Sequence, residues 1–264
     1  MVVLLTGGTS GIGLAAAEKF ASRGWKVYEL SRREASSAAG GVHLRADLAD
    51  RGSLEAAVAE VLRREGRIDA LVNNAGMGIF GAAETTAESA MRRQFEVNFF
   101  GTVNLTQLVL PIMRGQGGGR IVNIASCAAF FPLPFQSFYS AAKAALVAWS
   151  RALSGEVAPF KIGVTVICPG DIKTGFTAAR VSGRMKGGSG AALYDKAERH
   201  ALDKAAESEQ RGLDPEIVAE EIVRFAERKG PLVAIPGWQY ALLDRLARLL
   251  PRTLVSRLIA KLYI

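Results

Sequence analysis

The chain has 264 residues, of which 49% are hydrophobic and 22% are charged. This length suits one large α/β domain with a buried core, and the composition excludes an extensively disordered chain. The formal net charge is +8, but the basic residues are dispersed and are not interleaved with aromatic residues, which argues against nucleic acid as a partner.

Short β-rich runs alternate along the chain with segments of helical pattern, such as residues 14–23 and 53–66. The runs that we predict as strands are "MVVLLT", "KVYELS", "IDALVNNAG", "GRIVNIAS", "KIGVTVICPG" and, as a short edge strand, "PLVAIPG". This alternation is typical of βαβ units with right-handed crossovers. The sequence therefore predicts an α/β fold with a doubly wound parallel sheet and helices on both faces.

A glycine-rich stretch, "TGGTSGIG" at 6–13, joins the first predicted strand to the first helix. A P-loop is excluded because no lysine follows Gly13. The dinucleotide fingerprint does fit: Gly11 and Gly13 let the backbone approach a pyrophosphate at the helix N-terminus, and Ala16 permits close packing. An ordinary strand–helix turn is the alternative interpretation.

The second strand ends at Ser31 and is followed by Arg32 and Arg33, whereas Glu29 lies one pleat back from the tip. Two guanidinium groups at this point suit the 2′-phosphate of NADP(H), and a carboxylate there would repel it. We therefore predict NADP(H) as the cofactor. NAD(H), with the arginines merely solvated, is the alternative.

Further motifs follow the glycine-rich stretch in a fixed order. They are "NNAG" at 73–76, Asn98 in "FEVNFFGT", Ser126 in "IVNIAS", "YSAAK" at 139–143 and "CPGDIKT" at 168–174. Over residues 1 to about 175 this set resembles the classical short-chain dehydrogenases/reductases. The resemblance implies a Rossmann-like sheet of about seven strands and hydride transfer between an alcohol and a ketone or aldehyde.

The resemblance also implies the site. The positions that match the family's catalytic residues are Asn98, Ser126, Tyr139 and Lys143. Its cofactor-binding residues, together with the arginines above, are Gly7, Ser10, Gly11, Ile12, Gly13, Ser31, Arg32, Arg33, Asp47, Leu48, Asn74, Ala75, Gly76, Tyr139, Lys143, Pro169, Gly170, Ile172 and Thr174. By this likeness Asp47 lies beside adenine, Asn74 near its ribose, and Thr174 at the nicotinamide carboxamide. No metal site is implied.

The chemistry of these residue types supports the same roles. Tyr139 and Lys143 are four residues apart and share one helix face. A phenol is a poor base at neutral pH, so we expect the ammonium and an oxidised nicotinamide to lower the pKa of Tyr139. Tyr139 would protonate the substrate oxygen, Ser126 would hydrogen-bond it, and Asn98 would connect Lys143 to water. A surface Tyr-x-x-x-Lys pair, a strand-end serine and a helix-kinking asparagine are the plain alternatives.

The segment after the Pro-Gly turn, residues 175–213, is rich in Gly, Ala, Ser and charge, and we expect a mobile substrate-binding lid. Apolar contacts are expected from Phe176, Met185, Leu193 and Tyr194. A second set, Phe130, Phe131, Leu133, Pro134 and Phe135, is expected to line or border the pocket. These features favour a bulky apolar carbonyl or alcohol of steroid, retinoid or fatty acyl type.

The domain thus predicted covers residues 1–237, and residues 238–264 form a basic amphipathic extension with leucines at helical spacing. Such a helix can lie on an anionic membrane, cap the cleft, mediate subunit contact or simply pack as a terminal helix. This longer ending resembles the hydroxysteroid and retinol dehydrogenase branch. We expect a homodimer or homotetramer, although the extension speaks against the common tetramer.

The remaining features point to a reducing compartment. Cys127 and Cys168 lack the paired spacing of a metal cluster and are interpreted as packing residues. No signal peptide and no membrane-spanning run is recognised, so a cytoplasmic protein is expected, with peripheral membrane contact open. His43 and His200 are assigned no chemistry.

The interpretation of the whole sequence is an NADP(H)-dependent carbonyl reductase or alcohol dehydrogenase. A noncatalytic dinucleotide-binding sensor or scaffold and a peripheral membrane protein are the alternatives.

Overall fold

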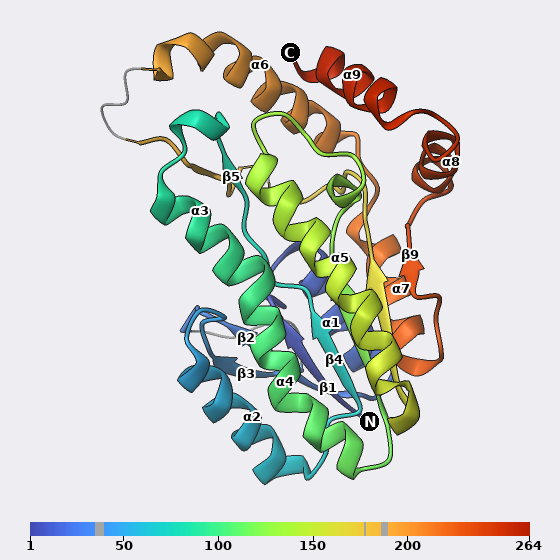
Figure 1. The fold of residues 1–264 in the computed structure, drawn as a ribbon. Coiled ribbons are helices and arrows are strands. Elements are labelled where there is room, and N and C mark those ends of the chain that lie inside the picture. The colour runs from blue at the N-terminus through green and yellow to red at the C-terminus, as the bar shows by residue number, and fades with distance from the viewer. Residues whose placement is uncertain (35–39, 177, 186–189) are drawn as a thin grey trace.

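A parallel sheet forms the centre of the computed structural model, which describes residues 1–34, 40–176, 178–185 and 190–264 (Figure 1). The sheet has seven strands in the order β3-β2-β1-β4-β6-β7-β9. These strands are β1 (Val2–Thr6), β2 (Lys26–Ser31), β3 (Val42–Arg45), β4 (Ala70–Asn73), β6 (Gly119–Ile124), β7 (Ile162–Ile167) and β9 (Val233–Ala234). The prediction of a Rossmann-like, doubly wound sheet of about seven strands is confirmed.

Helices cover both faces of this sheet. On one face lie α1 (Gly11–Ser22) and α7 (Pro215–Glu227), and on the other lie α2 (Arg51–Glu65), α4 (Gly101–Gly115) and α5 (Ser137–Val157). Alternate residues of β1 point to opposite faces, so Val3 packs with the first group and Leu4 with the second. Both faces are buried, and β1 therefore reads as a continuous apolar run.

Short elements connect these helices and strands. They are α3 (Glu88–Phe95), a π-helical turn (Glu96–Phe100) that leads into α4, and the 3-10 turns Ala83–Thr85, Cys127–Ala129 and Ala158–Phe160. The strand order reverses between β1 and β4, because the chain runs from β1 outward to β3 and then returns. In open parallel sheets such a switch point leaves a crevice at the carboxyl ends of the strands.

A second layer lies beyond the carboxyl ends of the strands. It contains α6 (Ala191–Gln210), α8 (Trp238–Ala247) and α9 (Arg252–Tyr263), and in Figure 1 these helices form the upper part of the molecule. Below α6, β5 (Ile79–Phe80) pairs in parallel with β8 (Val181–Ser182). No helix in the described part of the chain is both long enough and apolar enough to cross a membrane.

The structure gives the two expected segments of this layer a defined secondary structure. Much of the segment expected as a glycine-rich mobile lid is the long helix α6, because alanine, leucine, lysine and glutamate from residue 191 onward are strong helix formers. Residues 177 and 186–189 of that segment lie outside the described residues. The C-terminal extension forms two helices, since Pro251 follows α8 and caps the start of α9.

Candidate active site

A cavity of about 1480 Å³ occupies the crevice at the carboxyl ends of the strands. Most of the residues that the sequence predicts for the site line it: Gly7, Ser10, Gly11, Ile12, Ser31, Arg32, Arg33, Asp47, Leu48, Asn74, Ala75, Gly76, Ser126, Tyr139, Lys143, Pro169, Gly170, Ile172 and Thr174. Gly13 and Asn98 do not line it and lie behind its wall. The topology therefore brings together motifs that are spread over 168 positions of sequence, from Gly7 to Thr174.

The glycine-rich loop between β1 and α1 is shaped by close backbone contacts. Gly7 and Gly11 have positive φ angles of 72° and 54°. A Cβ atom on Gly13 would lie 2.1 Å from the carbonyl oxygen of Gly7, so only glycine fits there. The side chain of Asn74 donates hydrogen bonds to the carbonyl oxygens of Thr6 (3.0 Å) and Gly7 (3.2 Å) and so holds the loop against the end of β4.

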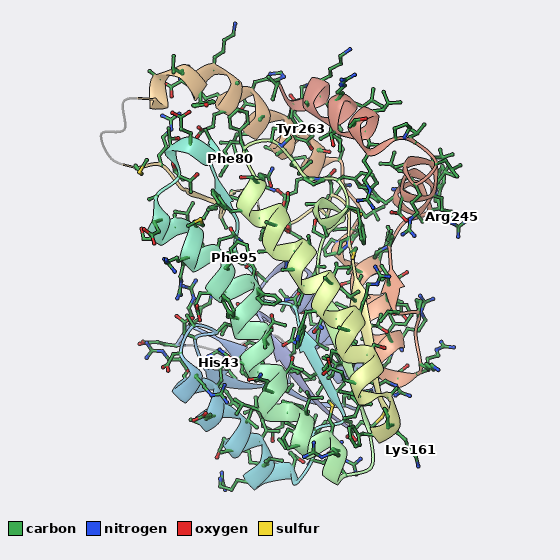
Figure 2. The ribbon with its side chains drawn as sticks, viewed as in Figure 1. His43, Phe80, Phe95, Lys161, Arg245 and Tyr263 are labelled. Carbon is green, nitrogen blue, oxygen red and sulfur yellow. The ribbon has the colours of Figure 1, made fainter. Side chains whose placement is uncertain are left out.

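The acidic residue of the second strand is turned away from the cavity. Glu29 is 1% exposed, and its carboxylate accepts a hydrogen bond from the backbone N–H of Gly8 at 3.1 Å. The other carboxylate oxygen lies 2.5 Å from Nδ1 of His43, a residue of β3 that Figure 2 labels. His43, to which the sequence assigned no chemistry, therefore holds this carboxylate beneath the glycine-rich loop.

The tip of the second strand carries the residues predicted to bind a 2′-phosphate. Arg32 and Arg33 are exposed and line the cavity. Ser31 also lines the cavity, and its buried hydroxyl has no hydrogen-bond partner among the described residues. A buried hydroxyl beside two guanidinium groups suits a ligand with many acceptor oxygens, so these residues fit the nucleotide that the motifs imply.

Asp47 lies in the same wall and is held ionised. Burial acts to raise the pKa of Asp47, but hydrogen bonds from the Ala49 N–H (2.9 Å) and from Arg93 (3.0 Å) outweigh it and lower that pKa. Its carboxylate is therefore an acceptor at neutral pH, as a residue beside an adenine base would need to be.

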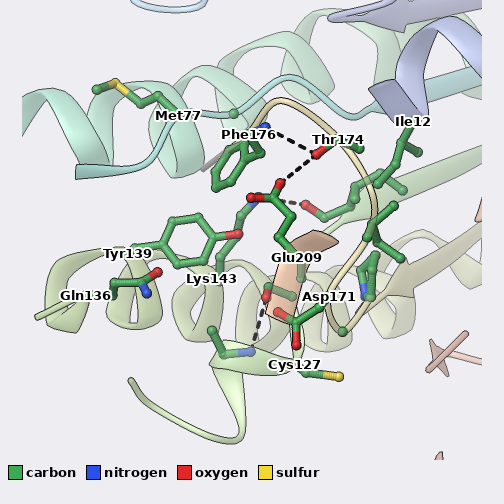
Figure 3. A pocket seen from close by; sticks show the side chains of 18 of the residues that line it. Ile12, Met77, Cys127, Gln136, Tyr139, Lys143, Asp171, Thr174, Phe176 and Glu209 are labelled. Atoms are coloured by element: carbon green, nitrogen blue, oxygen red, sulfur yellow. Dashed lines mark hydrogen bonds between the residues drawn. The ribbon is translucent and has the colours of Figure 1, made fainter. Parts of the chain in front are cut away.

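Tyr139 and Lys143 enter the cavity from the first turns of α5. They are 8% and 4% exposed, and Nζ of Lys143 lies 5.9 Å from the centre of the Tyr139 ring. The same Nζ donates a hydrogen bond of 2.8 Å to the carbonyl oxygen of Ile124 at the end of β6. Figure 3 shows both side chains directed into the same space.

The expected fall in the pKa of Tyr139 is not found. Burial raises the pKa of Tyr139, while hydrogen bonding to Ser126 and the charge of Arg180 offset this only in part. Burial also lowers the pKa of Lys143 to about 8. Compared with an ordinary lysine, a smaller fraction of Lys143 therefore carries the positive charge that was expected to stabilise a phenolate. The correction has one physical reason: removal from water disfavours the charged form of both groups.

The other two predicted catalytic residues have different surroundings. Ser126 follows β6 by two residues and caps the 3-10 turn Cys127–Ala129; it lines the cavity and accepts a hydrogen bond of 3.1 Å from the Ala128 N–H. Asn98 lies in the π-helical turn and is 1% exposed. Its amide exchanges two hydrogen bonds of 2.8 Å with the backbone of Met77, so it holds the segment after β4 in place.

Helix α6 adds a carboxylate that the sequence analysis missed. Glu209 is 8% exposed, lines the cavity, and accepts a hydrogen bond of 2.9 Å from Thr174, a residue predicted to bind the cofactor. Asp171 also lines the cavity, as Figure 3 shows, and its carboxylate accepts a hydrogen bond of 2.6 Å from Ser208. No local signal marks Glu209, because α6 joins the site only through tertiary packing.

Two further cavity residues carry buried donors without partners. The donor atoms are Nε2 of Gln136 and both Nε and Nη1 of Arg180, and none of them has a hydrogen-bond partner among the described residues. Gln136 precedes Tyr139 by one helical turn, and the Arg180 guanidinium lies 5.5 Å from the ring of Phe176. The Phe176 ring in turn lies 5.7 Å from that of Tyr139. Both donors therefore lie near the predicted acid and can serve a ligand.

The residues expected to form the substrate pocket divide into two groups. Phe131, Leu133 and Phe176 line the cavity. The other residues of the two sets, Phe130, Pro134, Phe135, Met185, Leu193 and Tyr194, do not line it. Leu193 is 83% exposed, the Tyr194 hydroxyl bonds to Glu84 at 2.6 Å, and Phe135 stacks on Phe80.

The C-terminal helices supply much of the apolar wall instead. The cavity residues of α8, of α9 and of the turn between them are Tyr240, Leu243, Leu246, Ala247, Leu250, Val255, Leu258, Ile259, Lys261, Leu262 and Tyr263. Tyr240 anchors α8, because its ring covers Gly170 so closely that a Cβ atom there would lie 2.2 Å from it. The expected cap over the cleft is therefore one role that this geometry supports.

The two cysteines are poor candidates for chemistry. The thiol of Cys127 donates a hydrogen bond of 3.2 Å to the carbonyl oxygen of Cys168. Burial raises the pKa of both thiols to about 12, so neither forms a nucleophilic thiolate at neutral pH.

Sequence comparison relates this site to known proteins. The family model described as short chain dehydrogenase matches residues 1–184. The 3-ketodihydrosphingosine reductase of Bacteroides thetaiotaomicron is 36% identical over 230 residues, which are 87% of this chain and 85% of that protein. Dehydrogenase/reductase SDR family member 7B of Mus musculus is 39% identical over 195 residues, which are 69% of this chain but 60% of that protein.

Solved structures share the fold over almost the whole chain. A short-chain dehydrogenase from Streptomyces avermitilis is 32% identical with a TM-score of 0.80, covering 97% of this chain and 94% of that one. A short-chain dehydrogenase/reductase from Burkholderia phymatum, in complex with NAD, is 26% identical with a TM-score of 0.81, covering 94% and 92%. A short chain dehydrogenase from Burkholderia cenocepacia, in complex with NADP, has the same fold with a TM-score of 0.76 at 23% identity, covering 98% and 97%.

Proposed function

The chain belongs to the short-chain dehydrogenase/reductase family and is an oxidoreductase of that family, and we propose that it uses NADPH to reduce the ketone of a long-chain, apolar substrate. The observation that carries this proposal is the cavity itself. One end meets the basic tip of β2, its middle contains Tyr139, and its other wall is built from the leucines of α8 and α9. Such a space suits a dinucleotide and an extended apolar chain together.

The preference for NADPH is supported by the charges at the tip of β2. Arg32, Arg33 and the unpartnered Ser31 hydroxyl favour a 2′-phosphate. Glu29, the acid that would compete for a ribose hydroxyl, is bound to Gly8 and His43 beneath the loop. When bound, the nicotinamide supplies the hydride.

The mechanism for the protein's own residues is general acid catalysis. Because burial raises its pKa, Tyr139 is protonated at neutral pH and can donate its proton to the carbonyl oxygen. Ser126 would hydrogen-bond the same oxygen and fix its position. Lys143, with a pKa of about 8, can return a proton to the phenolate that remains.

The substrate class is supported by the wall and by a relative. The relative named 3-ketodihydrosphingosine reductase acts, by that name, on a ketone carried by a long alkyl chain. The unpartnered donors of Gln136 and Arg180 favour a substrate with an acceptor oxygen close to the ketone. A hydroxyl beside the ketone and the carbonyl of a 3-oxoacyl thioester both meet this requirement.

The test is a set of initial rates with NADPH and with NADH. The substrates are 3-ketodihydrosphingosine, 3-oxoacyl thioesters of increasing chain length, a steroid ketone and a short simple ketone. We expect NADPH to be preferred by about tenfold or more, because a bidentate arginine–phosphate contact contributes at least about 1.4 kcal/mol, and kcat/KM to rise with chain length. Preference for NADH, or equal rates for short and long ketones, would contradict the proposal.

A further inference from the structure

The two C-terminal helices present an apolar surface to the outside as well as to the cavity. Four large side chains of these helices and of the turn between them lie outside the cavity wall: Trp238, Leu242, Leu249 and Leu254 are 78%, 46%, 81% and 41% exposed. No residue of α9 is fully buried. This concentration of exposed large apolar side chains is unusual for a surface that only meets water.

The outer surface is continuous with the cavity. Several leucines belong to the cavity wall and are nevertheless 42–66% exposed: Leu243, Leu246, Leu250, Leu258 and Leu262. Their side chains therefore border an opening between the cavity and the exterior. In Figure 2 Tyr263, a cavity residue, lies on the inner side of α9, whereas Arg245 lies at the outer edge of α8.

The charge of this surface is strongly positive. Residues 238–264 contain five basic residues, Arg245, Arg248, Arg252, Arg257 and Lys261, against a single acid, Asp244. Asp244 is buried and pairs with Arg248 at 2.7 Å. In the described part of the chain, none of the other four basic side chains lies within ion-pair distance of a carboxylate.

Charge also distinguishes the possible occupants of this surface. A second copy of the chain, docked by two-fold symmetry, would place one set of basic residues against an identical set. An anionic bilayer surface offers the opposite charge at the headgroups and an apolar layer beneath them, which matches arginines beside exposed leucines and a tryptophan.

We propose that α8 and α9 dock on an anionic lipid bilayer and that a lipid substrate enters the cavity from the bilayer through the opening between their leucines. The second half of this proposal rests on the proposed function. The docking itself depends only on the surface formed by residues 238–264, which we call the docking surface.

The first experiment is co-sedimentation of the full chain with two kinds of vesicle. One contains phosphatidylcholine alone, and the other also contains 30% phosphatidylglycerol, which is about one anionic lipid in three. We expect binding to the anionic vesicles that weakens as salt rises. The double variant Trp238→Ser/Leu249→Ser changes outward side chains only and should lower vesicle binding by about fivefold or more. The matched control is Leu193→Ser on α6, which is 83% exposed, lies outside the docking surface and should bind as the parent does.

The second experiment separates docking from catalysis. With a long-chain ketone embedded in anionic vesicles, the double variant should lose about fivefold or more of the parent's rate, in proportion to its lost vesicle binding. With a short water-soluble ketone its rate should not change. Absence of activity on every ketone would overturn the proposed function but would leave vesicle binding as measured.

Two outcomes would overturn the docking proposal. One is a parent protein that stays in the supernatant with anionic vesicles. The other is a parent protein whose self-association, measured by sedimentation velocity, is abolished by Trp238→Ser/Leu249→Ser while vesicle binding is unaffected, since this would assign the surface to a second copy of the chain.

Discussion

Burial acts in opposite directions on the two ionisable residues at the centre of the cavity. It raises the pKa of Tyr139 and lowers that of Lys143 to about 8, because both charged forms lose hydration. At neutral pH the pair is therefore a protonated phenol beside an amine that is still mostly charged but loses its proton more readily than an ordinary lysine. In this state Tyr139 can donate a proton to a carbonyl oxygen, as the proposed ketone reduction requires.

Replacement of the phenol tests this role directly. Tyr139→Phe keeps the ring and its contact with Phe176 but removes the proton donor. We expect kcat for ketone reduction to fall by about 10³-fold, the usual contribution of a general acid, while NADPH binding is kept. Steady-state rates and fluorescence titration with NADPH measure the two effects. A loss of less than tenfold would exclude Tyr139 as the acid.

We expect the buried Lys143 to lower the stability of the folded protein at pH values below 10.5, the ordinary pKa of a lysine. Since the folded pKa is about 8, the unfolded chain binds more protons between pH 8 and 10.5, and stability rises with pH across that window. At pH 7 the full penalty is about 3 kcal/mol. Lys143→Met removes this penalty but also removes the hydrogen bond to the Ile124 carbonyl, which contributes about 1 kcal/mol.

We therefore expect Lys143→Met to be inactive but more stable than the parent at pH 7, with a smaller gain at pH 9.5. Urea denaturation of the ligand-free protein at the two pH values measures the difference. A variant that is less stable at pH 7, or a gain that does not shrink with pH, would show that the buried amine is not destabilising.

Arg180 is a positioning residue for the charge of Tyr139. Its cation lowers the pKa of Tyr139, so its removal by Arg180→Met should raise that pKa. Alcohol oxidation requires the deprotonated phenol, so its rate rises with pH. We expect this rise in the pH–rate profile to move to higher pH in the variant. Arg180→Lys keeps the charge and should restore the parent profile. An unchanged pH profile in Arg180→Met would limit Arg180 to packing on Phe176.

At the scale of elements, the turn from β1 into α1 depends on one residue without a side chain. Gly13 lies in the first turn of α1, in close contact with the backbone of Gly7. This contact sets how close α1 lies to the end of β4, where Asn74 holds the loop. The N-terminus of α1, which is predicted to receive the pyrophosphate, is therefore positioned by packing as well as by its own hydrogen bonds.

Gly13→Ala should damage this arrangement. Its Cβ would lie 2.1 Å from the carbonyl oxygen of Gly7, which forces the loop to move. We expect NADPH affinity to fall by about tenfold or more and the melting temperature to drop, since overpacking costs about 1–3 kcal/mol. The control is Gly155→Ala in α5, where a Cβ meets nothing within 4 Å and should stabilise the helix by about 0.5–1 kcal/mol. Equal melting temperatures for the two variants would refute the close contact.

At the scale of the whole molecule, the cavity is assembled from both ends of the chain. The nucleotide side comes from β1, β2 and β4, and the apolar side comes from α8 and α9, more than 160 residues later than β4. The two sides meet at Tyr139. Changes in the C-terminal helices should therefore alter substrate preference while leaving cofactor binding unaffected.

Leu246→Trp tests this division. Leu246 lines the cavity on α8, and a larger side chain there should reduce kcat/KM for long-chain ketones by about tenfold, with short ketones and NADPH affinity unchanged. The control is Leu242→Trp, one turn earlier on the same helix and outside the cavity wall. Equal effects of the two variants on long and short ketones would show that α8 does not contact the substrate.

Local patterns account for the parts of this site that adjoin the strands. The glycine-rich stretch, the arginines after β2 and the Tyr139–Lys143 pair each lie where a parallel strand ends or a helix begins, and a parallel sheet gathers such positions at one edge. Residues such as Glu209, Gln136 and Arg180 carry no comparable pattern. Their place depends on how α6 and the connecting loops pack.

The alternation of apolar runs by itself determined the doubly wound sheet, because strands buried on both faces and amphipathic helices can satisfy their surfaces in few other ways. It also determined the edge at which the motifs gather. Only the tertiary structure decided the protonation of Tyr139 and Lys143, the turning of Glu29 towards His43, and the C-terminal wall of the cavity. Burial and long-range contact set these features, and neither quantity is encoded in the spacing of neighbouring residues.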